Sequence, residues 1–257
     1  MSEFTADHNA QLFDSADVVA DYEAVAGLTP CEQVLFDRYI PIGSDVLDLG
    51  VGAGRTVEPL RARARRYVGV DYAPNMIESC LTRFPDVEFH MGDAADLSRF
   101  DDGSFDAVVF SFNGIDCLYP DEARLRCLDE CRRVLRPGGT FVLSVHNPLG
   151  VFTVPPVRDL PPLVKARRFA RETLTGMRRA WNAVRGVGRR GEGYVMDPVH
   201  GGLVSHLATP RKVVEELAEH GFDHLETLPS TYPKRRPGLV VIWYYYAFRR
   251  REPATGS

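Results

Sequence analysis

The feature that most constrains the fold is an alternation of short apolar runs with helical segments, which starts at Asp45. Five such runs lie before residue 147, at 46–50, 67–71, 87–91, 105–112 and 140–146. Each run is followed by a helix or crossover, the arrangement of strands in a parallel sheet that helices cover on both faces. We therefore predict a doubly wound α/β domain.

The residues before this pattern predict two N-terminal helices. Residues 1–13 have no periodic pattern and are expected to fray, whereas 17–26 has helical spacing and ends at Gly27. The second helix is predicted to begin at Thr29 as the N-cap, with Pro30 in the first helical position and Glu32 completing a capping box.

The residues after the fourth run predict how the sheet is completed. A helix is expected at 120–135, and RPGG at 136–139 ends it in a tight turn. A further helix runs from Thr209 to Gly221, and the apolar runs near 222–228 and 239–248 follow it. The pattern predicts a strand, helix, strand, strand ending.

The segment 148–207 interrupts the pattern and is interpreted as a lid insertion. A Pro-rich link leads to a predicted helix, within 163–187, that has one apolar stripe. From Arg158 to Gly193, ten basic residues stand against three acidic ones. The basic face could be solvated, could meet an anionic acceptor, or could lie on a membrane or a phosphate backbone.

Composition limits the class of protein. With 257 residues, a net charge of −4 and a pI near 6.0, the chain fits one domain whose surface as a whole is not built for nucleic acid. We divide it into N-terminal helices (1–44), a core (45–147), the lid (148–207) and a return to the core (208–250). Five cysteines without a CxxC pair indicate reduced thiols. Without a signal peptide or an apolar stretch of roughly 18 residues, we expect a cytoplasmic protein.

The run VLDLGVGAGR indicates a ligand-binding turn between a strand and a helix. Its glycines let the backbone adopt a positive φ and let a ligand approach without a Cβ in the way. A nicotinamide fingerprint would have its third glycine at position 55, where this chain has Arg55. Asp71 ends the next strand, 21 residues after Gly50, where a carboxylate can accept both ribose hydroxyls.

Five motifs in order resemble those of the class I S-adenosylmethionine-dependent methyltransferases of the small-molecule type. They are Asp48-x-Gly50-x-Gly52-x-Gly54, Asp71 with the following YAPNM, Gly92-Asp93-Ala94, FDAVVFS, and RPGG. The resemblance is close over 45–146 and weaker over 209–248. It implies a mostly parallel, seven-stranded, Rossmann-like sheet with a helical lid insertion, S-adenosyl-L-methionine as cofactor and a small-molecule acceptor.

The resemblance also implies a set of cofactor-binding residues. Asp48 would receive the cofactor's amino group, Asp71 the ribose hydroxyls, and Asp93 with the backbone of Ala94 the adenine. The others would line the site: Tyr22, Gly50, Gly52, Gly54, Tyr72, Met76 and Phe112. Alternatives remain for several of these, since Asp48 could cap a loop, Asp93 could cap a helix and Met76 could belong to the core.

His146 is the candidate catalytic residue. A hydroxyl or ammonium acceptor must lose a proton on methylation, which calls for a general base. His146 ends the fifth strand, at the edge where ligands bind in this fold, and the ordinary histidine pKa of about 6.5 suits the task. A histidine hydrogen-bonded to a nearby loop is the alternative. His200 and His206 are second choices, and either could only anchor the returning lid.

The motifs narrow the function to O- or N-methylation of a small molecule, with a sugar or secondary metabolite preferred. After the fourth strand the chain reads SFNG, without the Asn-Pro-Pro-aromatic pattern of enzymes that methylate nucleic-acid bases. His146-Asn147 stands where metal-dependent relatives have an Asp-Asn pair, so no metal is expected. An RNA methyltransferase that uses the basic segment, a non-catalytic cofactor-binding regulator and a homodimer all remain open.

Overall fold

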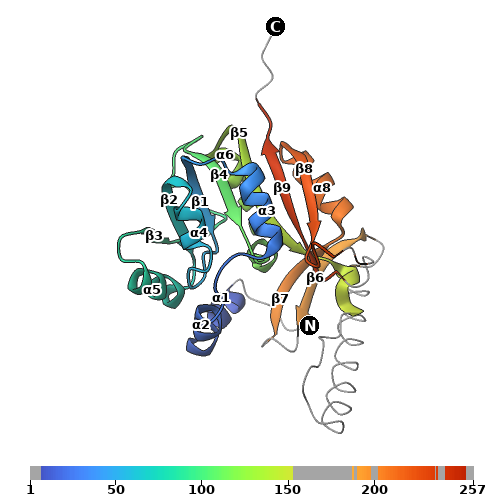
Figure 1. Cartoon of the computed structure of the whole chain (residues 1–257). Coiled ribbons are helices and arrows are strands. Elements are labelled where there is room, and N and C mark those ends of the chain that lie inside the picture. Colours follow the sequence, from blue (N-terminus) through green and yellow to red (C-terminus); the bar gives the residue numbers. More distant parts are fainter. Residues whose placement is uncertain are drawn as a thin grey trace.

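The computed structural model is built on one seven-stranded sheet in the order β3-β2-β1-β4-β5-β9-β8 (Figure 1). It describes residues 7–152, 187, 190–197, 202–234, 236 and 241–252. The pairs β1–β2, β1–β4, β2–β3 and β4–β5 are parallel, whereas β9 is antiparallel to both β5 and β8. The predicted doubly wound, mostly parallel α/β sheet is confirmed.

The elements follow one another in the predicted order. The strands of the sheet are β1 Ser44–Leu49, β2 Ala64–Asp71, β3 Glu88–Met91, β4 Phe105–Phe110, β5 Leu135–His146, β8 Phe222–Pro229 and β9 Trp243–Arg250. The helices packed on them are α3 Pro30–Tyr39, α4 Val57–Arg61, α5 Pro74–Arg83, α6 Asp121–Val134 and α8 Pro210–Glu219, with 3-10 turns η1 Gly114–Cys117 and η2 Pro148–Phe152.

Two apolar cores lie on opposite faces of the sheet, because successive side chains of a strand alternate between its faces. On β4, Val108 and Phe110 join the core formed with α6 and α8, while Ala107 and Val109 join the core formed with α3, α4 and α5. This two-sided burial explains why the strands read as nearly continuous apolar runs.

The N-terminal residues are more ordered than their sequence predicts. Residues 7–13 form α1 (Asp7–Phe13), so the expected fraying of 1–13 is wrong for the part that the structure describes. The buried Asn9 amide donates to the carbonyls of Val204, at 2.7 Å, and Cys117, at 2.8 Å. The residues that these hydrogen bonds join are 195 and 108 positions apart in the sequence, so a local sequence pattern cannot predict them.

The next two helices follow the prediction more closely. Helix α2 covers Ala16–Glu23, slightly shorter than expected. Helix α3 begins with the predicted capping box, in which the Thr29 side chain accepts from the Glu32 backbone and Glu32 accepts from the Thr29 backbone. The segment RPGG (136–139) was predicted to form a tight turn that ends the preceding helix. It lies instead inside β5, where it forms a bulge between the residue pairs Phe105–Leu135 and Ala107–Thr140 of strands β4 and β5.

The range assigned to the lid contains an antiparallel strand pair that was not predicted. Strands β6 (Glu192–Asp197) and β7 (Leu203–Ala208) form a two-stranded sheet, and β7 lies against η1 and β5. Figure 1 shows α1, α2 and this pair at the end of the main sheet where β1, β4 and β5 finish. Of the predicted basic helix at 163–187 only residue 187 is described, and His200 also lies outside the described residues.

Candidate active site

The glycine-rich turn after β1 has the backbone conformation that its sequence predicts. Gly50 and Gly52 have φ values of 60° and 55°, in the left-handed region that side chains disfavour. A Cβ on Gly50 would lie 2.7 Å from the Phe110 ring, and one on Gly52 would lie 3.1 Å from the ring of Tyr22. The turn is therefore a close-packed cradle that only glycine fits.

Two buried carboxylates lie beside this turn. Asp71 accepts from the backbone N–H of Gly52 at 2.8 Å through Oδ2 and from that of Ala73 at 3.0 Å through Oδ1. Asp48 accepts through one oxygen, Oδ2, from the hydroxyls of Thr56 at 2.6 Å and Tyr67 at 2.8 Å. Asp71 thus fixes the glycine turn against β2, and Asp48 fixes the start of α4.

Burial raises the pKa of both carboxyl groups. It raises the pKa of Asp48 to about 6, against the lowering effect of the two hydroxyl hydrogen bonds. It also raises the pKa of Asp71, against the lowering effect of the backbone N–H donors. Their predicted contacts with the cofactor's amino group and ribose remain predictions.

Helix α2 brings Tyr22 to the glycine turn. The Tyr22 ring lies against Gly52, and burial raises the pKa of its phenol well above the usual value. The Tyr72 hydroxyl is buried and has no hydrogen-bond partner in the described residues. Met76 is fully buried with Val19 in a small apolar cluster. That burial favours a packing role for Met76, and its contact with adenine remains a prediction.

The turn after β3 contains the residues predicted to bind adenine. The exposed Asp93 carboxylate accepts from the backbone N–H of Ala95 at 2.8 Å, so it caps this turn. Ala94 is buried beside it. A carboxylate oxygen has two lone pairs, so the cap leaves Asp93 able to accept a further hydrogen bond.

Phe112 and Asn113 form a strained turn after β4. Both have positive φ, 56° and 64°, although neither is glycine. Such backbone costs of order 1–3 kcal/mol per residue and is retained where the surroundings enforce it, often at functional sites. The Phe112 ring is 38% exposed, and the Arg55 guanidinium lies 4.7 Å from its centroid.

Arg55 is held by a buried ion pair with Glu32. Its two terminal nitrogens donate to the Glu32 carboxylate at 2.8 and 2.6 Å, and the Ser111 hydroxyl donates to the same group. Burial alone would raise the pKa of Glu32, but the hydrogen bonds and charge of Arg55 lower it. The pair joins α3 to the glycine turn and to the end of β4.

His146 lies at the carboxyl end of β5 in contact with Asp116 of η1. Its Nδ1 is 2.8 Å from Asp116 Oδ2, and its backbone N–H donates to the same oxygen at 2.7 Å. On the other side of the ring, Nε2 is 3.4 Å from Asn113 Nδ2. The side chain of His146 is 29% exposed, whereas that of Asp116 is 1% exposed. The structure thus forms a histidine–carboxylate pair at the ligand edge, which is the edge of the sheet formed by the carboxyl ends of the parallel strands.

His206 has a different environment. Its ring lies 5.2 Å from that of Tyr194, and the side chain lines a small void beneath the site together with Asp116 and Arg124. Burial lowers the pKa of His206 to about 3, and the nearby Arg124 charge lowers it further. This buried, neutral histidine fits the alternative of a structural anchor better than that of a base.

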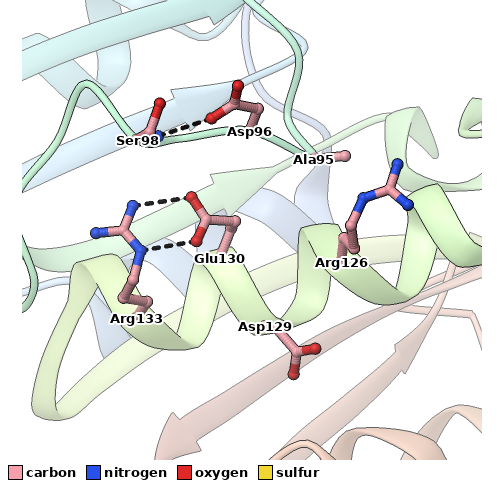
Figure 2. Close-up of a pocket in the computed structure, with 7 residues that line it drawn as sticks. All are labelled: Ala95, Asp96, Ser98, Arg126, Asp129, Glu130 and Arg133. Carbon is pink, nitrogen blue, oxygen red and sulfur yellow. Dashed lines mark hydrogen bonds and ion pairs between the residues drawn. The ribbon is translucent and has the colours of Figure 1, made fainter.

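A shallow groove of about 480 Å³ lies between α6 and the turn after β3, next to Asp93 and Ala94 (Figure 2). Its lining includes the ion pair Glu130–Arg133 and none of the predicted site residues. In the described ranges, no group of three or more His, Cys, Asp and Glu side chains could hold a metal ion. No helix of the described part of the chain has the length and apolar character needed to span a bilayer.

The fold and the edge residues define a class of protein: a doubly wound α/β protein with a nucleotide-type glycine turn and a carboxylate ending the next strand. The five cysteines are all free, as predicted. Comparisons with known proteins agree with this class.

Residues 46–139 match the family model described as a methyltransferase domain. A demethylmenaquinone methyltransferase of Beutenbergia cavernae is 34% identical over 201 residues, which cover 70% of this chain and 78% of that protein. A probable S-adenosylmethionine-dependent methyltransferase of Mycolicibacterium smegmatis is 39% identical over 119 residues, which cover 46% of this chain and 43% of that protein. A solved structure, that of the Burkholderia thailandensis 1,6-didemethyltoxoflavin-N1-methyltransferase with 1,6-didemethyltoxoflavin and S-adenosylhomocysteine bound, aligns with a TM-score of 0.63 at 16% identity, over 98% of this chain and 93% of that one.

The chain belongs to the class I S-adenosylmethionine-dependent methyltransferases. It spans about half the length of several of the curated relatives that it matches. The edge fits the cofactor of this family: the glycine turn has no room for a Cβ at Gly50, and the buried Tyr72 hydroxyl and Asn113 Oδ1 lack partners among the described residues. These polar atoms have hydrogen-bonding capacity that the described residues do not use.

The structure also shows site residues that the sequence analysis did not select. Asp116 and Glu32 lie among the candidate residues, and their contacts with His146 and Ser111 join parts of the chain 30 and 79 residues apart. The sequence indicated Glu32 only as part of a helix capping box. It indicated Arg55 only as the residue that replaces the third glycine of a nicotinamide-binding fingerprint. Asp116 had no sequence signal of its own.

Proposed function

We propose that this protein transfers a methyl group from S-adenosyl-L-methionine to an oxygen or nitrogen of a small molecule, with His146 as the general base. The observation that carries the proposal is the His146 imidazole at the carboxyl end of β5, supported by the buried Asp116 carboxylate. Bound there, the cofactor supplies a methyl group on a sulfonium, so the protein's part is mainly alignment and removal of the acceptor's proton.

The protein's own residues divide this work between two groups. The glycine turn, Asp71, Tyr72 and the turn at Asp93 would hold the cofactor, and Tyr22 would cover it from α2. His146 would take the acceptor's proton at Nε2, since Nδ1 is engaged by Asp116. Phe112, exposed beside these groups, offers an apolar surface on which the acceptor can rest.

The proposed acceptor class rests on the sequence motifs and on the relatives of this chain. The motifs typical of nucleic-acid base methylation are absent from the sequence, which favours a small molecule such as a sugar or secondary metabolite. Several relatives are named demethylmenaquinone methyltransferase, so demethylmenaquinone, which would receive the methyl group on a ring carbon and not on oxygen or nitrogen, is a second candidate acceptor.

The test is a methyl-transfer assay over a panel of phenols, sugars, amines and demethylmenaquinone, with S-adenosylhomocysteine release as the readout. For an acceptor that the wild type methylates, His146→Ala should lower kcat by about 10²–10⁴-fold, because a positioned base contributes that much. Affinity for S-adenosylhomocysteine should remain close to wild type. His224→Ala, at an exposed position on β8, is the matched control.

Two results would count against the proposal. Wild-type turnover by His146→Ala would remove His146 from the mechanism. Tight cofactor binding without transfer to any acceptor of the panel would favour a cofactor-binding regulator.

A further inference from the structure

We propose that Asp116 is a positioning residue that holds the His146 imidazole with its proton on Nδ1 and its Nε2 lone pair toward the acceptor. This inference rests on the proposed function, since it explains how His146 is prepared to act as a base. It concerns a residue with no sequence signal, brought to His146 from 30 positions away.

Hydrogen-bond chemistry determines where the proton lies. The Oδ2 atom of Asp116 receives the backbone N–H of His146 at 2.7 Å and faces Nδ1 at 2.8 Å. When the Asp116 carboxyl is ionised it can only accept, and Nδ1 is then the protonated nitrogen. In the neutral ring the lone pair is then on Nε2, whose polar neighbour is the Asn113 amide nitrogen at 3.4 Å.

Asp116 is fully buried and contacts the His146 imidazole directly. Burial raises the pKa of Asp116, and the hydrogen bonds and charge of His146 oppose that rise. The nearby Arg124 guanidinium is engaged by Glu216, at 2.6 and 2.7 Å, and by Asp121. The adjacent Cys117 thiol has its pKa raised by burial and therefore stays neutral.

Three further titratable side chains near the pair, among the described residues, are uncharged at neutral pH. The phenols of Tyr194 and Tyr246, from β6 and β9, have pKa values raised by burial. The pKa of His206 is lowered by burial to about 3, so that ring is also uncharged at neutral pH. The imidazolium formed at His146 is therefore the cation in direct contact with Asp116, and the buried carboxylate stabilises it.

Strand β5 also holds the turn that carries Asp116. The Ser144 hydroxyl accepts from the backbone N–H of Asn113 at 2.8 Å, and Ser144 is fully buried. Ser144 and His146 share one face of β5, since side chains two apart point the same way. The backbone N–H of Asp116 donates to the carbonyl of Asn113 at 3.1 Å. One strand thus supplies both the base and the contact that stabilises the left-handed turn leading to its carboxylate.

Two substitutions separate the charge of Asp116 from its shape. In Asp116→Asn the amide oxygen can take the place of Oδ2 and still accept both N–H groups, because the opposite placement would set an NH₂ against the backbone N–H of His146. The NH₂ then lies where Oδ1 has no partner in the described residues. Asp116→Asn therefore removes the charge and keeps the tautomer, whereas Asp116→Ala removes both.

Nitrogen NMR of histidine-labelled protein, in complex with S-adenosylhomocysteine, reads the tautomer without needing turnover. We expect the Nδ1–H form of His146 in the wild type and in Asp116→Asn, and its loss in Asp116→Ala. With an acceptor, kcat should fall about 10- to 100-fold in Asp116→Ala, part of what a positioned base contributes. In Asp116→Asn the acid limb of the pH–rate profile should move to lower pH, because the imidazolium has lost its carboxylate.

The control is Asp129→Asn, since Asp129 forms a similar 2.8 Å contact with Nδ1 of His220, with the Asp129 side chain 67% exposed. It should change neither the His146 signals nor the pH–rate profile. Persistence of the Nδ1–H form in Asp116→Ala would overturn the inference, and so would an unmoved acid limb in Asp116→Asn. If the wild type methylates no acceptor, the proposed function fails by itself, and the NMR result alone decides whether Asp116 sets the tautomer.

Discussion

The ligand edge holds its buried carboxylates in two different ways. On the β1–β2 side, Asp71 is held by backbone N–H groups and Asp48 by hydroxyls. On the β4–β5 side, Asp116 is paired with His146, and Glu32, which accepts from Ser111 at the end of β4, is paired with Arg55 of the glycine turn. Neutral donors surround the first pair of carboxylates, whereas charged or titratable side chains meet the second pair.

The difference shows where each half of the site gets its chemistry. Backbone N–H groups are fixed by the fold and cannot lose a proton, so the donors that hold Asp71 do not change with pH. A guanidinium or an imidazole brings a charge that substitution or protonation can remove. We therefore expect isosteric carboxylate-to-amide changes to act differently on the two sides.

The largest expected effect is that of Glu32→Gln. The amide would leave the Arg55 guanidinium, whose side chain is 10% exposed, without its carboxylate. Breaking a buried ion pair by removing one partner costs about 3–5 kcal/mol of folding free energy. Urea unfolding measures the loss. Asp86→Asn, which breaks the exposed pair with Arg61, is the control and should change stability little. If the two variants lost equal free energy of unfolding, burial of the Glu32–Arg55 pair would not add to its stabilising effect.

Asp48→Asn should act in the opposite direction. The pKa of Asp48 is raised to about 6, so ionisation of this carboxyl destabilises the folded state as pH rises from about 4 to about 6. The amide oxygen can still accept from Thr56 and Tyr67, because both donate to a single oxygen of Asp48. The variant should match the wild type near pH 4 and exceed it by about 3 kcal/mol above pH 6.

Urea unfolding at a series of pH values checks this difference. Taking the difference between the two proteins cancels the other titrating groups, which both share. A constant difference across pH 4 to 7 would show that Asp48 does not titrate in this range.

The two sides also differ in how far the sequence predicts them. The β1–β2 side lies within residues 48 to 73, where the alternation of strand and turn fixes both the glycines and Asp71. The order and type of the strands in the main sheet follow from the same alternation. Such local patterns survive because each strand is buried on both faces.

The β4–β5 side could be predicted only in part. His146 is recognisable because it ends a strand, but its partner Asp116 lies 30 residues earlier in a 3-10 turn without a motif. Asn9, which orders α1, contacts residues up to 195 positions away. Side-chain contacts at such separations depend on the folded arrangement and leave no periodicity in the sequence.

The smallest expected effect, that of Asp71→Asn, tests the comparison within the β1–β2 side. Unlike Asp48, Asp71 uses separate oxygens for its two donors, the N–H groups of Gly52 and Ala73. An amide has one acceptor oxygen, so its NH₂ must face one of these N–H groups and leave that donor unsatisfied. Relief from burying a charge offsets part of the cost, and we expect a net loss of about 1 kcal/mol. Affinity for S-adenosylhomocysteine should fall about tenfold, measured by calorimetry. Asp71→Asn could instead stabilise the protein, as we expect of Asp48→Asn. That result would show that the two backbone N–H donors of Asp71 do not make an amide unfavourable at this position.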